Sequence, residues 1–219
     1  DVPRRIHITN VGGAGMSAVA TLLAQMGHRV SGHDPADDTP FLASLRALGV
    51  VISTGAETAS VEREVDVVVV STATPADHPD VAAARRASVP VVHRAQALAA
   101  ICARRRVAAV AGTHGKTTTS ALLATLLAEA GVEPGWVVGA RIAGLGSSAA
   151  WGGDGPLVVE ADESDGTFLA LGAFAGVVTN VEPDHLEHWG SEAALRQAFV
   201  DFVQALDGPA VLCLDDPGA

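Results

Sequence analysis

Short runs of β-branched residues alternate along this chain with segments rich in alanine and leucine, and no other feature limits its possible folds so strongly. Parallel strands need a long crossover, usually a helix, so the alternation predicts an α/β fold in which helices cover parallel sheets. Strands are predicted near 6–10, 29–32, 50–53, 65–71, 91–93, 106–111, 136–138, 157–161, 176–180 and 210–214. Helices are predicted near 16–26, 39–48, 79–87, 95–103, 117–131 and 192–206, and a loop near 139–155.

The only lysine of the chain, Lys116, stands between a predicted strand and a predicted helix, in the run AGTHGKTTT at 111–119. Glycines let the backbone turn so that its amides and the helix N-terminus point at an anion, and a lysine at this position typically reaches a nucleotide's outer phosphates. The run therefore predicts a phosphate loop whose Thr117 hydroxyl is available to magnesium. Val110 replaces the first glycine of the strict motif, so a glycine turn with an exposed lysine is the alternative.

The helix predicted after this loop has four leucines at helical spacing, which are expected to form one stripe. They are Leu122, Leu123, Leu126 and Leu127.

A second glycine turn, GGAGMSA at 12–18, follows the first predicted strand directly. It fits the dinucleotide-binding pattern G-x-G-x-x-A, and Asp34 closes the next strand, where such a domain places its ribose-binding acid. The same geometry suits any diphosphate resting on a helix N-terminus. NAD, a diphosphate sugar nucleotide and a tight turn without a ligand therefore all remain open.

Two predicted strands run directly into polar segments, LVVEADESD at 157–165 and TNVEPDHLEH at 179–188. Clustered carboxylates repel one another unless a cation or hydrogen-bond donors lie among them. Strand carboxyl ends face the ligand crevice of an α/β sheet, so these segments predict a magnesium site, with a solvated acidic loop as the alternative. Their charged and imidazole side chains are Glu160, Asp162, Glu163, Asp165, Glu182, Asp184, His185, Glu187 and His188.

The composition, 219 residues with 48% hydrophobic side chains and a formal net charge of -11, indicates a soluble acidic protein and argues against a nucleic-acid partner. The arginine groups at 85–86 and 104–106 are interpreted as solvated helix ends. Cys102 and Cys213 lack metal-ligand spacing, which predicts two buried thiols in a reducing cytoplasm. No run predicts a membrane span or a signal peptide.

The triple arginine at 104–106 also marks a predicted domain boundary, since the length allows two compact domains. We predict a Rossmann-like, parallel-sheet domain at 1–104, followed at 105–219 by a P-loop ATPase α/β domain.

Four motifs, in this order, resemble the Mur ligase family, whose members make bacterial cell-wall peptide precursors. They are GGAGMSAVA at 12–20, AGTHGKTTT at 111–119, VEADESDGTF at 159–168 and TNVEPDHLEHWG at 179–190. The resemblance extends over nearly the whole chain and implies an amide ligation that uses ATP and Mg²⁺. In it, the lactyl carboxylate of UDP-N-acetylmuramate becomes an acyl phosphate, which an amine then attacks.

The resemblance also implies roles for individual residues. Lys116 would hold the β- and γ-phosphates of ATP, and Thr117 and Glu160 would ligate one Mg²⁺. His185 would ligate a second Mg²⁺ near the acyl phosphate. The remaining implied ATP contacts are Gly112, Thr113, His114, Gly115 and Thr118. The implied acceptor contacts are Gly12, Gly13, Ala14, Gly15, Met16 and Ser17 for the UDP diphosphate, Asp34, Ser71 and Thr72 for uridine, and Asp162, Glu163, Ser164 and His188 around the muramoyl group.

The presence of only one lysine also indicates which branch of the family the chain resembles. Members that add later amino acids resemble one another in a carbamylated lysine, and this chain has no second lysine for that role. It is therefore similar to the branch that adds L-alanine, with the murein-peptide recycling ligase as the alternative. Outside the family, an NAD-binding oxidoreductase and a nucleotide-binding regulator remain open, although hydride transfer does not need a phosphate loop.

Two departures from the family pattern accompany the resemblance. The loop GSSAAWGGDG at 146–155 differs from the family's usual run, which leaves acceptor contacts at Ser148 and Ala150 open. The sequence ends at 215–219, just after a strand expected inside the central ATPase domain. We therefore expect an incomplete central domain, no C-terminal domain and no ligation by this chain unaided. A homodimer is the assembly left open.

Overall fold

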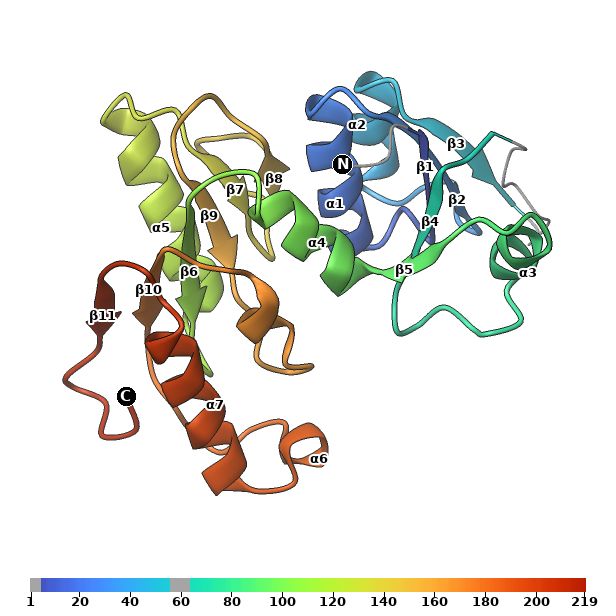
Figure 1. Cartoon of the computed structure of the whole chain (residues 1–219). Helices are drawn as coiled ribbons and strands as arrows, with labels where there is room; N and C mark the ends of the chain where they lie inside the picture. The colour runs from blue at the N-terminus through green and yellow to red at the C-terminus, as the bar shows by residue number, and fades with distance from the viewer. Residues whose placement is uncertain (1–4, 56–63) are drawn as a thin grey trace. The chain divides into compact units, whose positions relative to one another are not determined.

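The computed structural model describes residues 5–55 and 64–219 of the chain, which form two compact units, Asp1–Ala100 and Ile101–Ala219. Figure 1 follows both units along the sequence. The division falls inside helix α4 (Arg94–Cys102), a few residues before the predicted boundary.

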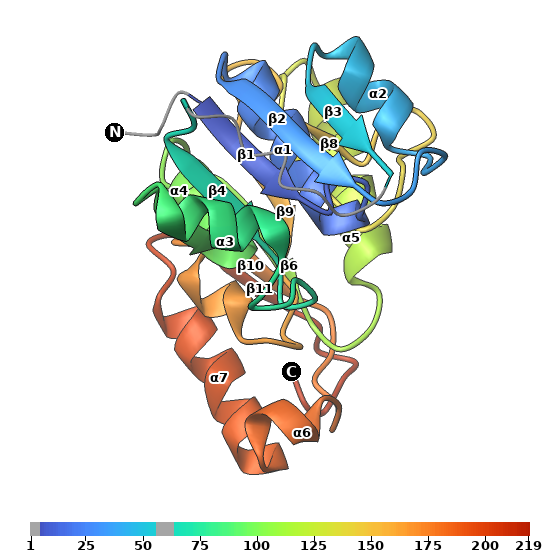
Figure 2. The same ribbon diagram turned by 90° about the vertical axis from the view of Figure 1, so that its right-hand side faces the viewer.

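The first unit is a five-stranded parallel sheet in the order β3-β2-β1-β4-β5 (Figure 2). Its strands are β1 (Arg5–Thr9), β2 (Arg29–Asp34), β3 (Val51–Thr54), β4 (Val67–Val70) and β5 (Val91–His93). Its helices besides α4 are α1 (Ala14–Gln25), α2 (Leu42–Ala47) and α3 (Pro79–Arg86). The strand order reverses between β1 and β4, and ligands of open α/β sheets bind at such a switch point. The predicted Rossmann-like sheet is confirmed.

Both faces of this sheet are covered, as its central strands require. Ile6 and Ile8 of β1 point to one face and His7 and Thr9 to the other, and all four are buried. Strand β4 is a run of four valines, the composition typical of a parallel strand buried on both faces. The polar pair His7 and Thr9 therefore lies inside the protein, where each side chain needs a partner.

The second unit has a six-stranded sheet in the order β11-β10-β6-β9-β7-β8. Its strands are β6 (Val107–Ala111), β7 (Gly135–Val137), β8 (Ala149–Ala150), β9 (Leu157–Glu160), β10 (Ala175–Val178) and β11 (Ala210–Leu212). Its helices are α5 (Lys116–Glu129), η1 (Thr167–Ala170), α6 (Leu186–Trp189) and α7 (Glu192–Gln204). Edge strand β11 exposes all three of its residues. The predicted α/β domain with a strand, a glycine loop and a helix in sequence is confirmed.

Strand β8 corrects the prediction of a loop throughout 139–155. Ala149 and Ala150 pair antiparallel with Val137 and Trp136, in a sheet whose other pairs are parallel. Two residues cannot show an alternating pattern, so sequence periodicity gives no signal for a strand this short.

Only one side of the predicted leucine stripe on α5 faces the core. Leu123 and Leu127 pack against the core cluster, whereas Leu122 and Leu126 are 58% and 66% exposed. Positions four apart share a helix face, so adjacent leucine pairs form two rows about 100° apart, and only one row faces the sheet. The buried members of the cluster are Ala124, Val138, Ile142 and Val158.

The triple arginine is not simply a solvated helix end. The Arg105 guanidinium donates hydrogen bonds to the carbonyls of Trp151, Gly153 and Gly155, and its carbon lies 4.6 Å from the centre of the Trp151 ring. Burial of the guanidinium lowers the pKa of Arg105. The side chain thus holds the loop before β9 to the start of β6, a contact between segments far apart in sequence.

Both cysteines are free thiols, as predicted. Cys102 is buried and Cys213 is half-buried. Burial raises the pKa of the Cys102 thiol to about 12. Over the described residues, no helix has the length and apolarity needed to cross a bilayer.

Candidate functional site

The loop between β6 and α5 is held in shape by the end of β10. Gly112 and Gly115 adopt φ angles of +130° and +80°, a region that favours glycine. A side chain on Gly112 would also collide with the Thr179 hydroxyl. Thr179 Oγ1 and Asn180 Nδ2 both donate to the His114 carbonyl, at 2.6 and 3.0 Å, and the His114 amide donates to Asn180 Oδ1 at 2.8 Å. The loop that follows β6 is therefore held in place by residues that follow β10.

Lys116 begins α5, and its ammonium points back into the loop. It donates to the carbonyls of Gly112 and Thr113 at 2.7 and 3.2 Å and lies 2.8 Å from Glu163 Oε2. Glu163 is 1% exposed. The lysine predicted to bind phosphate thus holds an anionic oxygen already. The sequence analysis had assigned Glu163 to the muramoyl group and had not paired it with Lys116.

Thr117 and Glu160 lie together on the neighbouring helix and strand. Thr117 Oγ1 donates to Glu160 Oε1 at 2.8 Å, and the Gly139 amide donates to the second carboxylate oxygen at 2.5 Å. A hydroxyl and a carboxylate are hard oxygen donors of the type that Mg²⁺ prefers. These two residues fit the predicted magnesium site.

His185 occupies a different setting. Its ring nitrogens lie 3.9 Å from Asp184 Oδ2 and 3.6 Å from Glu187 Oε1, and its φ is +50°. Within 5–55 and 64–219, no hydrogen bond or ion pair found joins it to Thr117 or Glu160. The second Mg²⁺ ligand stays a prediction.

The other residues predicted around the muramoyl group are held locally. Asp162 accepts from the Ser164 amide at 3.0 Å, and the His188 ring packs edge-on against Trp189 at 4.8 Å. These contacts shape the segments after β9 and before α7, and the predicted contacts with the acceptor stay predictions.

The glycine turn of the first unit lies at the N-terminus of α1, and its Gly13 amide donates to the Asn10 carbonyl at 3.1 Å. Gly13, Ala14 and Gly15 are exposed, and no side chain caps the helix. Helix N-terminal amides without intrahelical partners form a natural anion site. Met16 and Ser17 are buried, and Ser17 Oγ donates to the Ala14 carbonyl, so these two side chains serve the turn itself.

Asp34 anchors this turn. Its Oδ2 accepts from the Gly12 amide at 2.7 Å, its Oδ1 accepts from the Ala36 amide at 3.0 Å, and the residue is 6% exposed. A side chain on Gly12 would meet the same carboxylate at 2.7 Å. In this structure both carboxylate oxygens bind backbone, and contact with uridine stays a prediction.

Arg94 is a residue of this site that the sequence analysis missed. A side chain on Gly15 would lie 3.1 Å from the Arg94 guanidinium, so this cation rests against the turn. Arg94 begins α4 directly after β5, and a strand followed at once by an arginine could have signalled it. Ser71 and Thr72, the other predicted uridine contacts, follow the end of β4. Ser71 bonds Thr74 through its amide and hydroxyl, and Thr72 is exposed.

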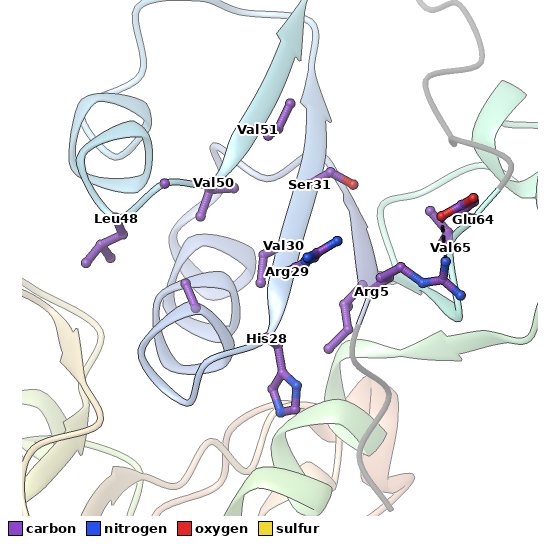
Figure 3. Close-up of a pocket in the computed structure, with 13 residues that line it drawn as sticks. Arg5, His28, Arg29, Val30, Ser31, Leu48, Val50, Val51, Glu64 and Val65 are labelled. Atoms are coloured by element: carbon purple, nitrogen blue, oxygen red, sulfur yellow. Dashed lines mark hydrogen bonds and ion pairs between the residues drawn. The ribbon is translucent and has the colours of Figure 1, made fainter.

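A hollow of about 340 Å³ lies at the opposite edge of the first sheet (Figure 3). It is lined by residues at the beginnings of β1 and β2, among them Arg5 and Arg29, and Arg5 pairs there with Glu64 at 2.8 Å. The glycine turn follows the end of β1. The hollow is therefore separate from the predicted ligand sites.

Family models match both units. The model described as "Mur ligase family, catalytic domain" matches residues 5–106, and "Mur ligase middle domain" matches residues 110–219. The chain belongs to the Mur ligase family.

Two curated relatives of this Mur ligase chain carry the same name. The proteins called UDP-N-acetylmuramate--L-alanine ligase from Azoarcus sp. (strain BH72) and Kineococcus radiotolerans are 46% and 47% identical to it, each over 98% of the chain and 46% of the relative. The chain thus spans about half the length of the curated relatives it matches.

Solved structures agree with this grouping. The UDP-N-acetylmuramate-alanine ligase of Thermotoga maritima has a TM-score of 0.89 and 32% identity, covering 98% of this chain and 50% of that one. The UDP-N-acetylmuramate:L-alanyl-gamma-D-glutamyl-meso-diaminopimelate ligase of Neisseria meningitides has a TM-score of 0.86 and 28% identity, covering 99% and 73%. The predicted family resemblance is confirmed.

Proposed function

We propose that this chain forms the UDP-N-acetylmuramate-binding and ATP-binding parts of a ligase that joins L-alanine to UDP-N-acetylmuramate. Residues 1–104 bind the sugar nucleotide and residues 105–219 bind ATP. The observation that carries the proposal is the loop lysine Lys116, which lies at a helix N-terminus and pairs with the buried carboxylate of Glu163, while its neighbour Thr117 bonds Glu160. The chain that holds this loop is similar to alanine-adding ligases over nearly its whole length.

The chemistry of such a ligation explains why a lysine is needed. The acceptor carboxylate and the γ-phosphate are both anionic, so positive charge has to offset their repulsion as they meet. Lys116 binds the outer phosphates, and the uncapped amides at the start of α5 bind the rest of the triphosphate. The three N–H donors of the Lys116 ammonium are engaged by two loop carbonyls and Glu163, so a phosphate oxygen replaces one of these partners when ATP binds.

Thr117 and Glu160 would hold Mg²⁺ through a hydroxyl and a carboxylate oxygen. The ion supplies a Lewis acid that withdraws charge from the phosphate oxygens. The Gly139 amide keeps the Glu160 carboxylate oriented. His185 is proposed as a ligand of a second Mg²⁺.

In the first unit, the amides of Ala14 and Gly15 at the N-terminus of α1 bind the diphosphate of UDP-N-acetylmuramate. The Arg94 guanidinium, which rests against Gly15, adds a charge-assisted contact. Asp34 supports this site because its carboxylate accepts a hydrogen bond from the Gly12 amide and so holds the turn in shape. The lactyl carboxylate of the bound sugar nucleotide then attacks the γ-phosphorus of ATP, which expels ADP and forms an acyl phosphate. The neutral amine of L-alanine attacks this acyl carbon, releases phosphate and loses a proton as the amide forms.

Calorimetric titration of this chain tests the proposal. UDP-N-acetylmuramate should bind saturably and NADH should not, and ATP with Mg²⁺ should bind the unmodified chain but not Lys116→Gln. Arg196→Gln, which removes a surface cation from α7, is the matched control and should leave ATP binding unchanged. NADH binding in place of the sugar nucleotide would refute the ligase assignment.

The amino acid is tested separately, by ADP release with L-alanine against L-alanyl-γ-D-glutamyl-meso-diaminopimelate in a longer ligase that contains this chain. Turnover with L-alanine alone supports the alanine-adding branch. Turnover with the tripeptide alone would move the proposal to the recycling branch.

A further inference from the structure

A polar cluster is buried in the first unit, beneath α3, apart from the ligand sites described above. Helix α3 packs against β4 and β5. The cluster consists of His33 at the end of β2, His78 just before α3 and Asp80 in its first turn. Their exposed fractions are 2%, 2% and 0%. Helix–sheet interfaces are normally apolar, so three titratable side chains here call for an explanation.

The three side chains converge. One ring nitrogen from each histidine and one carboxylate oxygen from Asp80 all lie within 4.8 Å of one another. This is the only group of three or more histidine, cysteine or acidic side chains with metal-binding geometry in the part of the chain that the structure describes.

The cluster contains polar atoms without partners. Both ring nitrogens of His33 and Nε2 of His78 are buried and make no hydrogen bond. A neutral imidazole carries one donor and one acceptor, and buried polar atoms normally find partners because their hydration is lost. His33 in particular is a complete ring with nothing bound to it. A bound ion would use a lone pair that the protein itself leaves unused.

Asp80 adds a charge argument. A carboxylate that is 0% exposed has lost its hydration and needs compensating positive charge. Its Oδ2 lies 3.2 Å from His7 Nε2, while His7 Nδ1 lies 3.0 Å from Ser31 Oγ. His7 therefore orients the carboxylate from outside the cluster, in the way that second-layer hydrogen bonds orient metal ligands.

We propose that His33, His78 and Asp80 bind a divalent transition-metal ion, with Zn²⁺ the best match. Two imidazole nitrogens and one carboxylate oxygen form a donor set typical of Zn²⁺ and unlike the all-oxygen donors of Mg²⁺. Zinc bonds of about 2.0–2.1 Å place tetrahedral ligand atoms ~3.3 Å apart, so ligand atoms that lie up to 4.8 Å apart here must approach by up to ~1.5 Å.

The binding mode has a consequence for His78. Its Nδ1 accepts a hydrogen bond from the Asp80 amide at 3.2 Å. Coordination through Nε2 moves the proton of the neutral ring to Nδ1, so this long hydrogen bond is exchanged for the metal bond. Because the ligands come from β2 and from the start of α3, the ion joins two segments that are distant in sequence and stabilises the first unit.

The test uses the untagged 219-residue chain, stripped of metal and titrated with Zn²⁺ and with Co²⁺. One equivalent of metal should be retained, Co²⁺ should give the intense visible absorption of a low-symmetry, four- or five-coordinate site, and Zn²⁺ should raise the melting temperature of the first unit. His33→Gln and His78→Asn should each lower metal affinity at least tenfold. His28→Gln, a histidine of the same unit outside the cluster, is the matched control and should bind normally.

Two further measurements keep the result decisive. Glu160→Gln should retain the Co²⁺ absorption, which separates this site from the proposed Mg²⁺ site and from the ligase assignment. Zinc X-ray absorption on the unmodified chain should show imidazole scattering, and this readout does not depend on a variant folding. Oxygen-only scattering, no visible Co²⁺ absorption, or equal metal binding by His33→Gln would overturn the proposal and leave a buried water as the partner of these atoms.

Discussion

The pairing of Lys116 with Glu163 predicts a large energetic coupling between the two residues. The ammonium is 14% exposed and the carboxylate 1%, at 2.8 Å. Coulomb's law at an effective dielectric of 20 gives about 6 kcal/mol of attraction at this distance, which desolvation partly offsets. Replacing Lys116 by Met leaves a buried carboxylate unpaired and removes two hydrogen bonds to loop carbonyls, so we expect a loss of about 3–5 kcal/mol in unfolding free energy.

Glu163→Gln should cost less, about 1–2 kcal/mol, because Lys116 keeps its carbonyl partners and some hydration. The double variant Lys116→Met with Glu163→Gln should be more stable than the sum of the single effects predicts, by at least ~1.5 kcal/mol.

Urea unfolding followed by tryptophan fluorescence measures this directly, since all three tryptophans lie in the second unit. The i,i+4 pair of Arg196 and Glu192, about half-exposed at 2.9 Å, is the control, and Arg196→Met should change stability by no more than ~0.5 kcal/mol. Additivity of the two single variants within about 0.5 kcal/mol would refute the inferred coupling.

Three other perturbations have defined outcomes. Asp34→Ala removes two hydrogen bonds from a buried carboxylate to backbone amides and should destabilise the first unit by about 2–3 kcal/mol in calorimetry, with loss of UDP-N-acetylmuramate binding; unchanged stability would contradict the anchoring role. Gly112→Ala places a side chain where the backbone φ is +130°, a value unfavourable for alanine, and where its Cβ would collide with the Thr179 hydroxyl. ATP binding should therefore be lost in titration, and normal affinity would show that the loop can relax. The raised pKa of Cys102, about 12, keeps its thiol protonated at pH 8, so a thiol reagent should label Cys213 first and Cys102 only on unfolding.

Sequence reasoning succeeded where the signal is local. A strand, a glycine turn and a helix are contiguous at 107–129, so the loop around Lys116 could be predicted, as could the turn after β1. These features need only the order of elements along the chain. The pairing of Thr117 with Glu160 was implied by the family resemblance, and the structure brings the two residues together because β6 and β9 are neighbours whose carboxyl ends meet.

The remainder depends on tertiary contacts that no spacing reveals. Glu163 reaches Lys116 across 47 positions, and Arg105 reaches Gly155 across 50. His33 and His78 carry no motif, and they meet only because the start of α3 packs near the end of β2 in the folded unit. The leucine rows of α5 show the same limit, since helical spacing fixes which side chains share a face but not which face the sheet covers.

Strand β11 also bears on how this protein behaves at high concentration. It stands at the end of the sheet order with Val211 59% exposed, and it borders Leu214, which is 95% exposed. An apolar edge strand is a template for pairing with another chain. Self-association through this edge would give oligomers that grow with concentration and depend on backbone pairing. A charged residue at Val211 should therefore suppress any assembly that arises from edge pairing, while leaving an assembly built on another surface intact.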